Sequence, residues 1–511
     1  MHFTKQNMTG GVFMKNISYG FNKFLNLALK ILFLFIVVGS IVYFNVEKPD
    51  ITGLSICFII ITIILVGGTY YGLKNKYNKS LIVTVILGSA LIIRILWFYN
   101  IYSIPVGDFN RMFICAGDFL DGSTDMFKDT AYMARFPHMS MTVLYFALIR
   151  GTFSNPLLAI RFLNIILSMF NVVLLFFIAK EVFDDENKSI WVCLISALYP
   201  PMIAYNNVYC SENIAVPILL LSIFTFLKVF NKNSSKKFLL IFLSGVLLSI
   251  THLFRPIGYV MIIAYIMYIF IYLKDSIKIK VVMNLLVVSA FVIPLVGISY
   301  TLIGLNITEN PLWSGTEPPS ISILKGTNIE AGGAWNEEDA ALFNQYEGDY
   351  ERVDNAAKNI IKERLTENSP QDLFKFYTLK YVRQWYAGDF GGFYWAEIGL
   401  DEAYNKIDYL DMMGQDEGKM SIRLSKEGDF YTQLFFATVL LLSYIGLYRN
   451  NNMKNHKIYI FYIIFCGISI QCLITEAQAR YTYPFSWLFI ILAMTAFSSN
   501  KDNTGGENGG V

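Results

Sequence analysis

Long apolar runs divide this chain and constrain its fold more than any other feature. A membrane-spanning helix needs about 20 apolar residues. Twelve runs approach that length, at 24–46, 53–73, 81–101, 157–180, 189–205, 213–230, 238–254, 257–273, 281–303, 431–448, 457–474 and 484–498. A thirteenth run, at 139–149, is too short to cross and predicts a helix lying in the membrane interface. With 55% hydrophobic residues and a mean hydropathy of +0.46, the chain is predicted to be an all-α polytopic membrane protein.

The charges between these runs predict an orientation. Lysine and arginine are enriched in cytoplasmic loops. If Lys5, Lys15 and Lys23 are cytoplasmic, four clearly basic loops fall on the same side, at 74–79, 231–237, 274–280 and 449–457. Both termini are then cytoplasmic in a cell-membrane protein. The opposite, extracytoplasmic side receives 102–155, the turn at 206–212, the segment 304–430 and the turn at 475–483.

Composition also divides the chain into regions. Residues 1–80 hold a tail and two extra spans, 81–303 a core with the outer loop 102–155, and 431–498 the last spans before a disordered tail at 499–511. Between them, 304–430 carries 23 of the 39 acidic residues against 12 basic ones, which predicts a small water-facing insert. Inside it, Ser369, Pro370 and Asp372 begin an amphipathic helix over 369–388 that we expect to lie on the membrane.

Ionisable side chains gather on the predicted outer face. Such groups near lipid cost free energy unless they are paired or hydrated, so their convergence suggests a site. The set comprises Asp108, His138, Glu212, Arg255, Glu476 and Arg480. Carboxylates accept protons or hold cations, and the arginine guanidinium matches phosphate oxygens.

The sequence has no motif typical of redox, nucleotide-binding or nucleic-acid-binding proteins. The six cysteines form no CxxC pair, no phosphate-binding glycine loop is present, and a net charge of +2 over 511 residues gives no reason to expect nucleic acid.

Five segments together resemble the GT-C glycosyltransferases, in particular family 39, the protein mannosyltransferase and aminoarabinose transferase-like enzymes. They are GDFNRMFICAGDFLDG, RFPHMSMTVLYFALIRGTFSNPLLAIRFLN, YPPMIAYNNVYCSE, HLFRPIG and EAQARYTYP. The resemblance covers about 81–274 and 475–498. It implies inverting transfer of a sugar from a polyprenyl-phosphate donor to an extracytoplasmic acceptor.

The same resemblance implies roles for the gathered residues. Asp108 matches the acid of the first outer loop, which deprotonates the acceptor hydroxyl, and Glu212 matches the second acid, which contacts substrate or metal. Arg255 and Arg480 would hold the lipid phosphate. His138 and Glu476 are further substrate-binding candidates, Glu476 with Arg480 as an ion-pair partner at i, i+4.

Several alternatives stay open at this point. A transporter or flippase for lipid-linked sugars would have similar composition, although such proteins commonly place charges at mid-membrane. An envelope glycan polymerase or ligase is a second alternative. The acceptor could be an envelope polysaccharide, a teichoic acid, a lipid or a protein. A donor-synthesising glycosyltransferase and a flippase are implied partners, while the sugar, a divalent metal and the oligomeric state are undetermined.

Overall fold

The computed structural model describes residues 2–101, 103–231, 236–401, 422–449 and 456–497. Within these ranges the chain forms helices and no β-strand. The predicted all-α fold is confirmed. The tail at 499–511, predicted to be disordered, lies outside the described residues.

Among the described residues, eight helices are long and apolar enough to cross a membrane, so the chain is a multi-pass membrane protein. They correspond to eight of the predicted runs. Their bounds are α1 (His2–Glu47), α2 (Gly53–Lys74), α3 (Lys79–Asn100), α7 (Pro156–Phe183), α11 (Lys237–Phe254), α13 (Ile277–Gly304), α20 (Ile422–Arg449) and α21 (Tyr459–Ile474).

The other four predicted runs form shorter helices, so twelve full spans stay a prediction. These helices are α8 (Glu186–Leu198), α10 (Glu212–Lys228), α12 (Gly258–Tyr272) and α23 (Trp487–Ala493). The sequence analysis predicted a single helix over the run at 189–205, and this prediction is wrong. It breaks at Tyr199, which is extended, and continues as α9 (Pro200–Ala204). A proline disfavours the helical conformation of the residue before it, which explains the break.

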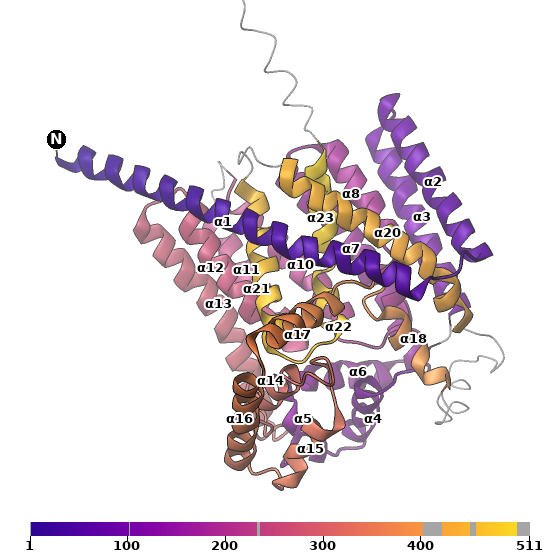
Figure 1. The fold of residues 1–511 in the computed structure, drawn as a ribbon, viewed down its shortest axis with the longest axis vertical. Helices are drawn as coiled ribbons and strands as arrows, with labels where there is room; N and C mark the ends of the chain where they lie inside the picture. Colours follow the sequence, from indigo (N-terminus) through magenta and orange to yellow (C-terminus); the bar gives the residue numbers. More distant parts are fainter. Residues whose placement is uncertain (1, 102, 232–235, 402–421, 450–455, 498–511) are drawn as a thin grey trace, which may run out of the picture.

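The central bundle is built on α8, α7, α10, α11 and α13, which pack side by side in that order. The approach of α11 to α13 is close: a Cβ added at Gly245 would lie 2.7 Å from the carbonyl oxygen of Val287. Glycine, which has no Cβ, is therefore the residue that fits there. In Figure 1, α1 runs obliquely across one face of the bundle, and α2 and α3 stand together at one side.

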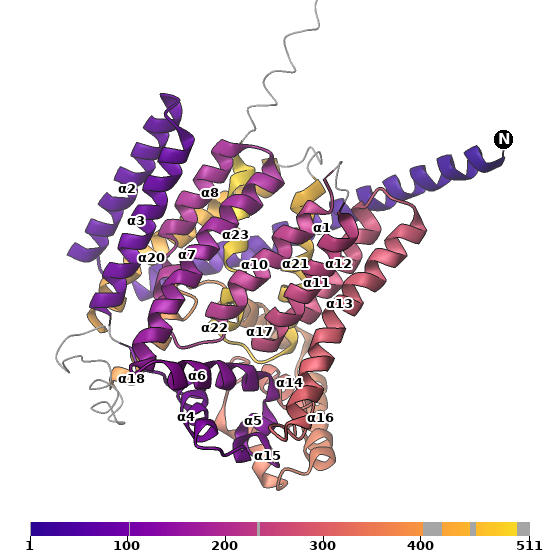
Figure 2. The ribbon, with the colours of Figure 1, turned by 180° about the vertical axis from the view of Figure 1, so that it is seen from behind.

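Short helices cover one end of the bundle, as Figure 2 shows. From the first outer loop come α4 (Asp108–Leu120), α5 (Tyr132–Arg135) and α6 (Ser140–Thr152), and α6, which contains the thirteenth run, lies across the bundle end. From the insert come α14 (Ser320–Gly326), α15 (Glu337–Gln345) and α16 (Tyr350–Glu367), which share a small apolar core. An ion pair between Arg135 and Glu317 joins the two groups.

The predicted amphipathic helix is present as α17 (Pro370–Arg383). The Ser369 hydroxyl accepts a hydrogen bond from the Asp372 amide, and Pro370 occupies the first turn. Lys380 anchors this helix by donating to the carbonyls of Gly326 and Leu473, at 2.7 and 2.8 Å. The anchor ties the insert to the end of α21, next to the turn that carries Arg480. That α17 lies on the membrane stays a prediction.

Candidate active site

Four segments distant in sequence meet at the covered end of the bundle. They contribute Asp108 at the start of α4, Glu212 at the start of α10, Arg255 just after α11, and Arg480 on α22 (Ala479–Thr482). Arg480 Nη2 lies 3.7 Å from Asp108 Oδ2, and its Nε lies 3.9 Å from Glu212 Oε1. Arg255 Nη2 lies 3.4 Å from the same Glu212 oxygen. We call these four side chains the outer cluster.

Asp108 is the accessible acid of the outer cluster, with 32% of its side chain exposed. Gly107 before it has a φ of +54°, a conformation that favours glycine and begins α4 directly at the aspartate. The Tyr132 hydroxyl donates to Asp108 Oδ1 at 2.5 Å. This bond orients the carboxylate, and burial together with Asp108 raises the pKa of the tyrosine, so Tyr132 stays a donor.

Glu212 is completely buried, and its predicted contact with substrate or metal stays a prediction. Its Oε1 faces both arginines, and its Oε2 lies 3.4 Å from the Ser211 hydroxyl. Two cations within 4 Å favour the ionised carboxylate despite its burial. In this arrangement Glu212 holds the two guanidinium groups beside each other.

Arg480 lies in an aromatic enclosure. Its guanidinium carbon is 4.8 Å from the centre of the Phe109 ring and 4.5 Å from that of Trp395. Only 4% of the side chain is exposed, and Nη1 and Nε have no hydrogen-bond partner among the described residues. A buried donor without a partner costs about 1–3 kcal/mol. The outer cluster therefore keeps unused donors for an anion.

His138 and His252 lie beside Arg255 but differ in setting. Burial and the nearby Arg255 lower the pKa of His138 to about 4, while Asp108 opposes the shift, which places this histidine within electrostatic reach of the outer cluster. His252 Nδ1 accepts a hydrogen bond from the Gly258 amide at 3.1 Å, across the turn that carries Arg255. His252 is thus a structural support of that turn.

Glu476 does not pair with Arg480, contrary to the expectation from their spacing. Its Oε2 lies 3.5 Å from Lys325 Nζ of α14, and its Oε1 accepts from Gln478 and Tyr481 at 2.9 and 3.3 Å. The reason is that the chain turns between the two residues and is not one helix, since α22 begins only at Ala479. Glu476 joins the insert to the turn that presents Arg480.

A divalent metal does not fit the residues of this site well. Both carboxylates face arginines, and the described residues contain no group of three or more His, Cys, Asp or Glu side chains placed to hold a metal ion. No step proposed below is routed through a metal.

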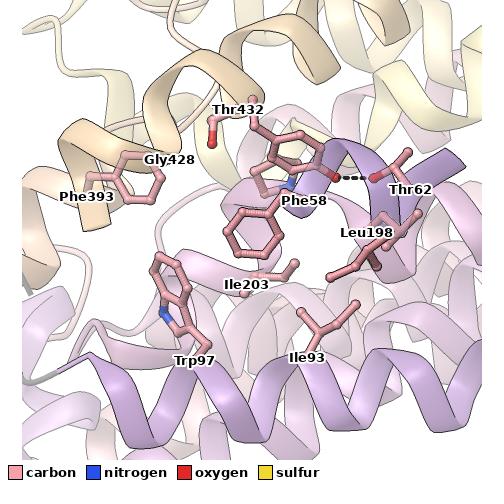
Figure 3. Close-up of a pocket in the computed structure, with 12 residues that line it drawn as sticks. Phe58, Thr62, Ile93, Trp97, Leu198, Ile203, Phe393, Gly428 and Thr432 are labelled. Atoms are coloured by element: carbon pink, nitrogen blue, oxygen red, sulfur yellow. Dashed lines mark hydrogen bonds between the residues drawn. The ribbon is translucent and has the colours of Figure 1, made fainter. Parts of the chain in front are cut away.

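An apolar pocket lies elsewhere, between α2, α3, α9, α20 and α18 (Gly392–Asp401), and encloses about 30 Å³ (Figure 3). Phe58, Trp97 and Phe393 line it, and Thr62 bonds to Tyr431 at its edge, at 2.8 Å. Phe393 and Trp395 are two residues apart on α18, so the helix contributes one ring to the pocket and another to the Arg480 enclosure. The pocket itself contains no residue of the outer cluster.

Comparison with known protein families gives a match over the middle of the chain. The family model described as dolichyl-phosphate-mannose-protein mannosyltransferase matches residues 137–299. These residues make up about a third of the chain, and over them the chain is similar to that family. The match confirms the resemblance found in the sequence. It includes His138, Glu212 and Arg255, while Asp108 and Arg480 lie outside it.

Solved structures of the Archaeoglobus fulgidus oligosaccharyltransferase are also similar to the chain. AglB in complex with an inhibitory peptide and a dolichol-phosphate is 14% identical, with a TM-score of 0.43 over 83% of this chain and 50% of that one. The apo form is 12% identical, with a TM-score of 0.44 over 83% and 51%. This chain thus spans about half the length of those proteins. Comparison with the curated proteins finds no match.

Three aromatic residues contact side chains of the outer cluster. Tyr132 bonds to Asp108, Trp395 packs on Arg480, and the Tyr481 ring lies 5.0 Å from the Arg255 guanidinium carbon. Tyr481 had a signal, since it directly follows Arg480. Tyr132 had none, because its contact with Asp108 depends on how separate segments fold together.

Proposed function

We propose that this protein transfers a sugar from a polyprenyl-phosphate donor to a hydroxyl of an extracytoplasmic acceptor, with inversion at the anomeric carbon. The observation that carries the proposal is the state of the outer cluster. It combines an accessible, oriented carboxylate with two arginines whose ion pairs, at 3.4–3.9 Å, are too long to use up their donors.

Asp108 is the group that would accept the proton. As the acceptor oxygen attacks the anomeric carbon, a new carbon–oxygen bond forms and the bond from that carbon to the phosphate oxygen breaks. The acceptor proton passes to the Asp108 carboxylate, and polyprenyl phosphate leaves. A carboxylate is a weak base, so the proton moves late, when attack has made the hydroxyl acidic. The Tyr132 hydroxyl keeps Asp108 oriented meanwhile.

Arg255 and Arg480 would stabilise the departing phosphate. Charge grows on the phosphate as its bond to the sugar breaks, and fixed donors in a water-poor site stabilise that charge by several kcal/mol. Glu212 prevents the two cations from repelling each other apart and so places them before the donor arrives. In this role Glu212 is a positioning residue.

The location we propose is the cell membrane, with the covered end of the bundle outside and both termini in the cytoplasm. The basic loops that support this orientation lie at the other end, where Lys79, Lys237 and Lys457 form ion pairs with acidic residues. The acceptor would be an envelope polysaccharide, a teichoic acid, a lipid or a protein. A cytoplasmic glycosyltransferase and a flippase would supply the donor at this face.

Membranes containing the wild type or Asp108→Asn provide the test, with expression and folding verified in both. Labelled polyprenyl-phosphate sugars are supplied, and label is followed into envelope material. Transfer that is lost in the variant supports the proposal, and the labelled product identifies the acceptor. Equal transfer by both proteins would remove Asp108 from the chemistry. Movement of the labelled lipid across the membrane without any transfer would instead establish a flippase.

A further inference from the structure

The two acids of the outer cluster are far apart in sequence, and each follows a segment that connects helices. Asp108 follows the segment 98–107, where the chain leaves α3. Glu212 follows the segment 205–211, where it enters α10. Phe98 lies in the last turn of α3, whereas 103–107 and 205–211 belong to no long helix, so something else must fix the relative position of the two segments.

We propose that Arg161 of α7 is a positioning residue that fixes the segment before Asp108 against the segment before Glu212. The inference rests on the proposed function for its catalytic consequence. It adds a residue that lies outside the outer cluster and that acts only through the two acids.

The first support is the set of hydrogen bonds that Arg161 donates. Its Nη2 reaches the carbonyl of Ile101 at 2.7 Å and also the carbonyl of Phe98. Its Nε reaches Asn207 Oδ1 at 3.4 Å, and its guanidinium carbon lies 4.4 Å from the centre of the Phe98 ring. The side chain is completely buried. One guanidinium thus joins both segments, which the planar fork of arginine allows and the single ammonium of lysine does not.

The second support is that the neighbouring bonds connect the same two segments. Asn207 Nδ2 donates to the carbonyl of Ile101 at 2.9 Å, and the Tyr209 hydroxyl donates to that of Ser103 at 3.1 Å. Asn164, one turn after Arg161 on α7, donates to the carbonyls of Asn206 and Val208 at 3.1 and 3.2 Å. These backbone carbonyls have left their helices and need donors, so the network both satisfies them and fixes their spacing.

The structure offers a matched control in Arg94 of α3. It is also a completely buried arginine with several hydrogen bonds, to Ser168 Oγ at 2.8 Å and to the carbonyls of Ala90 and Ala197 at 3.2 and 3.0 Å. None of these three partners belongs to the segments 98–107 or 205–211. A lysine at 94 perturbs a buried cation without touching the connection between the acids.

The experiment compares Arg161→Lys, Tyr209→Phe and Arg94→Lys in the full-length protein. We expect kcat for sugar transfer to fall roughly 10- to 100-fold in Arg161→Lys and several-fold in Tyr209→Phe, with KM for the donor little changed, because misplacement by about 1 Å costs that much. Arg94→Lys is expected to stay within about threefold of wild type. Tyr209→Phe keeps the inference testable if Arg161→Lys fails to fold.

Two further measurements separate positioning from general destabilisation. In an Asp108→Asn background, Arg161→Lys should cost nothing more, since it acts through the acid that is already missing. Hydrogen exchange should rise together at 103–108 and 205–211 in Arg161→Lys and stay unchanged there in Arg94→Lys. Additive losses, or exchange that rises in neither segment, would overturn the inference. If the wild type transfers no sugar, only the proposed function is refuted. The exchange data still decide whether Arg161 joins the two segments.

Discussion

Two arginine–carboxylate groups in this molecule look alike in sequence and differ in how completely they are bonded. In the insert, Arg364 donates to both oxygens of Asp339, at 2.8 and 3.1 Å, and Asn328 and Asn336 complete the set at 3.1 and 2.9 Å. In the outer cluster the corresponding contacts are 3.4–3.9 Å, and buried donors stay unused.

The difference separates a fully bonded group from one that can still bind a ligand. A buried charge whose hydrogen bonds are all made stabilises one arrangement and has nothing left to offer a ligand. A buried group with unused donors lowers the stability of the empty protein and gains when an anion arrives. Bonding geometry, and not residue type, therefore marks the outer end of the bundle as the site.

The largest effect is expected from Asp108→Asn. Removing the proton acceptor should lower transfer on the order of 10³-fold, within the range for a general base, and leave thermal stability unchanged. The matched control is Asp118→Asn, because Asp118 is an exposed residue of the same helix α4. Initial rates with labelled donor measure both. Equal losses of transfer in the two variants would mean that activity depends on the negative charge of α4 and not on the Asp108 carboxylate as proton acceptor.

Exchanging arginine for lysine in each group sharpens the comparison. Arg480→Lys should lower transfer on the order of 10²- to 10³-fold, since it removes a donor of the phosphate site, with little change in melting temperature. Arg364→Lys should lower the melting temperature and leave transfer almost unchanged, because the two bonds from Arg364 to Asp339 serve only the insert. Rates and melting curves of the two variants, measured side by side, decide the matter. If both lose stability equally, the outer cluster is structural as well.

Asp339→Asn tests the insert alone. Leaving Arg364 without its acid should destabilise the insert by about 3 kcal/mol, the lower end for a buried pair because 21% of Arg364 is exposed. Protection of 320–364 from hydrogen exchange measures the loss. Asp354→Asn is the control on α16, where an exposed pair with Lys358 should contribute nothing measurable. Protection that survives Asp339→Asn would show that the apolar core of the insert suffices.

Much of this arrangement could be predicted from the sequence, because the features concerned are local. Apolar runs define the spans, Ser369 and Pro370 define where α17 begins, and the charge of the loops places Asp108, Glu212, Arg255 and Arg480 at one end. The break before Pro200 was missed, although it had a local signal, since the residue before a proline disfavours the helical conformation.

The rest depends on contacts between segments that no spacing reveals. Lys325, which pairs with Glu476, lies far from it in sequence, and Tyr132 bonds to Asp108 from another short helix. The burial of Glu212 likewise depends on the arginines brought by α11 and α22. Spacing suggested that Glu476 pairs with Arg480, and tertiary structure gave both residues other partners.

The smallest effect concerns acid, and it separates the two groups by pH. Burial and Arg255 lower the pKa of His138 to about 4, below its ordinary value near 6.5, so the folded protein favours the neutral imidazole. That stability is present above pH 6.5 and is lost as pH falls from there toward 4. Burial acts to raise the pKa of Asp339, but bonds from Arg364, Asn336 and Asn328 lower it below its ordinary value of about 3.8. The insert therefore loses the stability contributed by Asp339 only below that pH.

Hydrogen exchange during acidification should show the outer loop around His138 loosening before the insert, and His138→Asn should remove the first step and leave the second. Simultaneous loosening at one pH would mean that the two groups unfold as a single unit, and that the contrast in bonding does not extend to their response to protons.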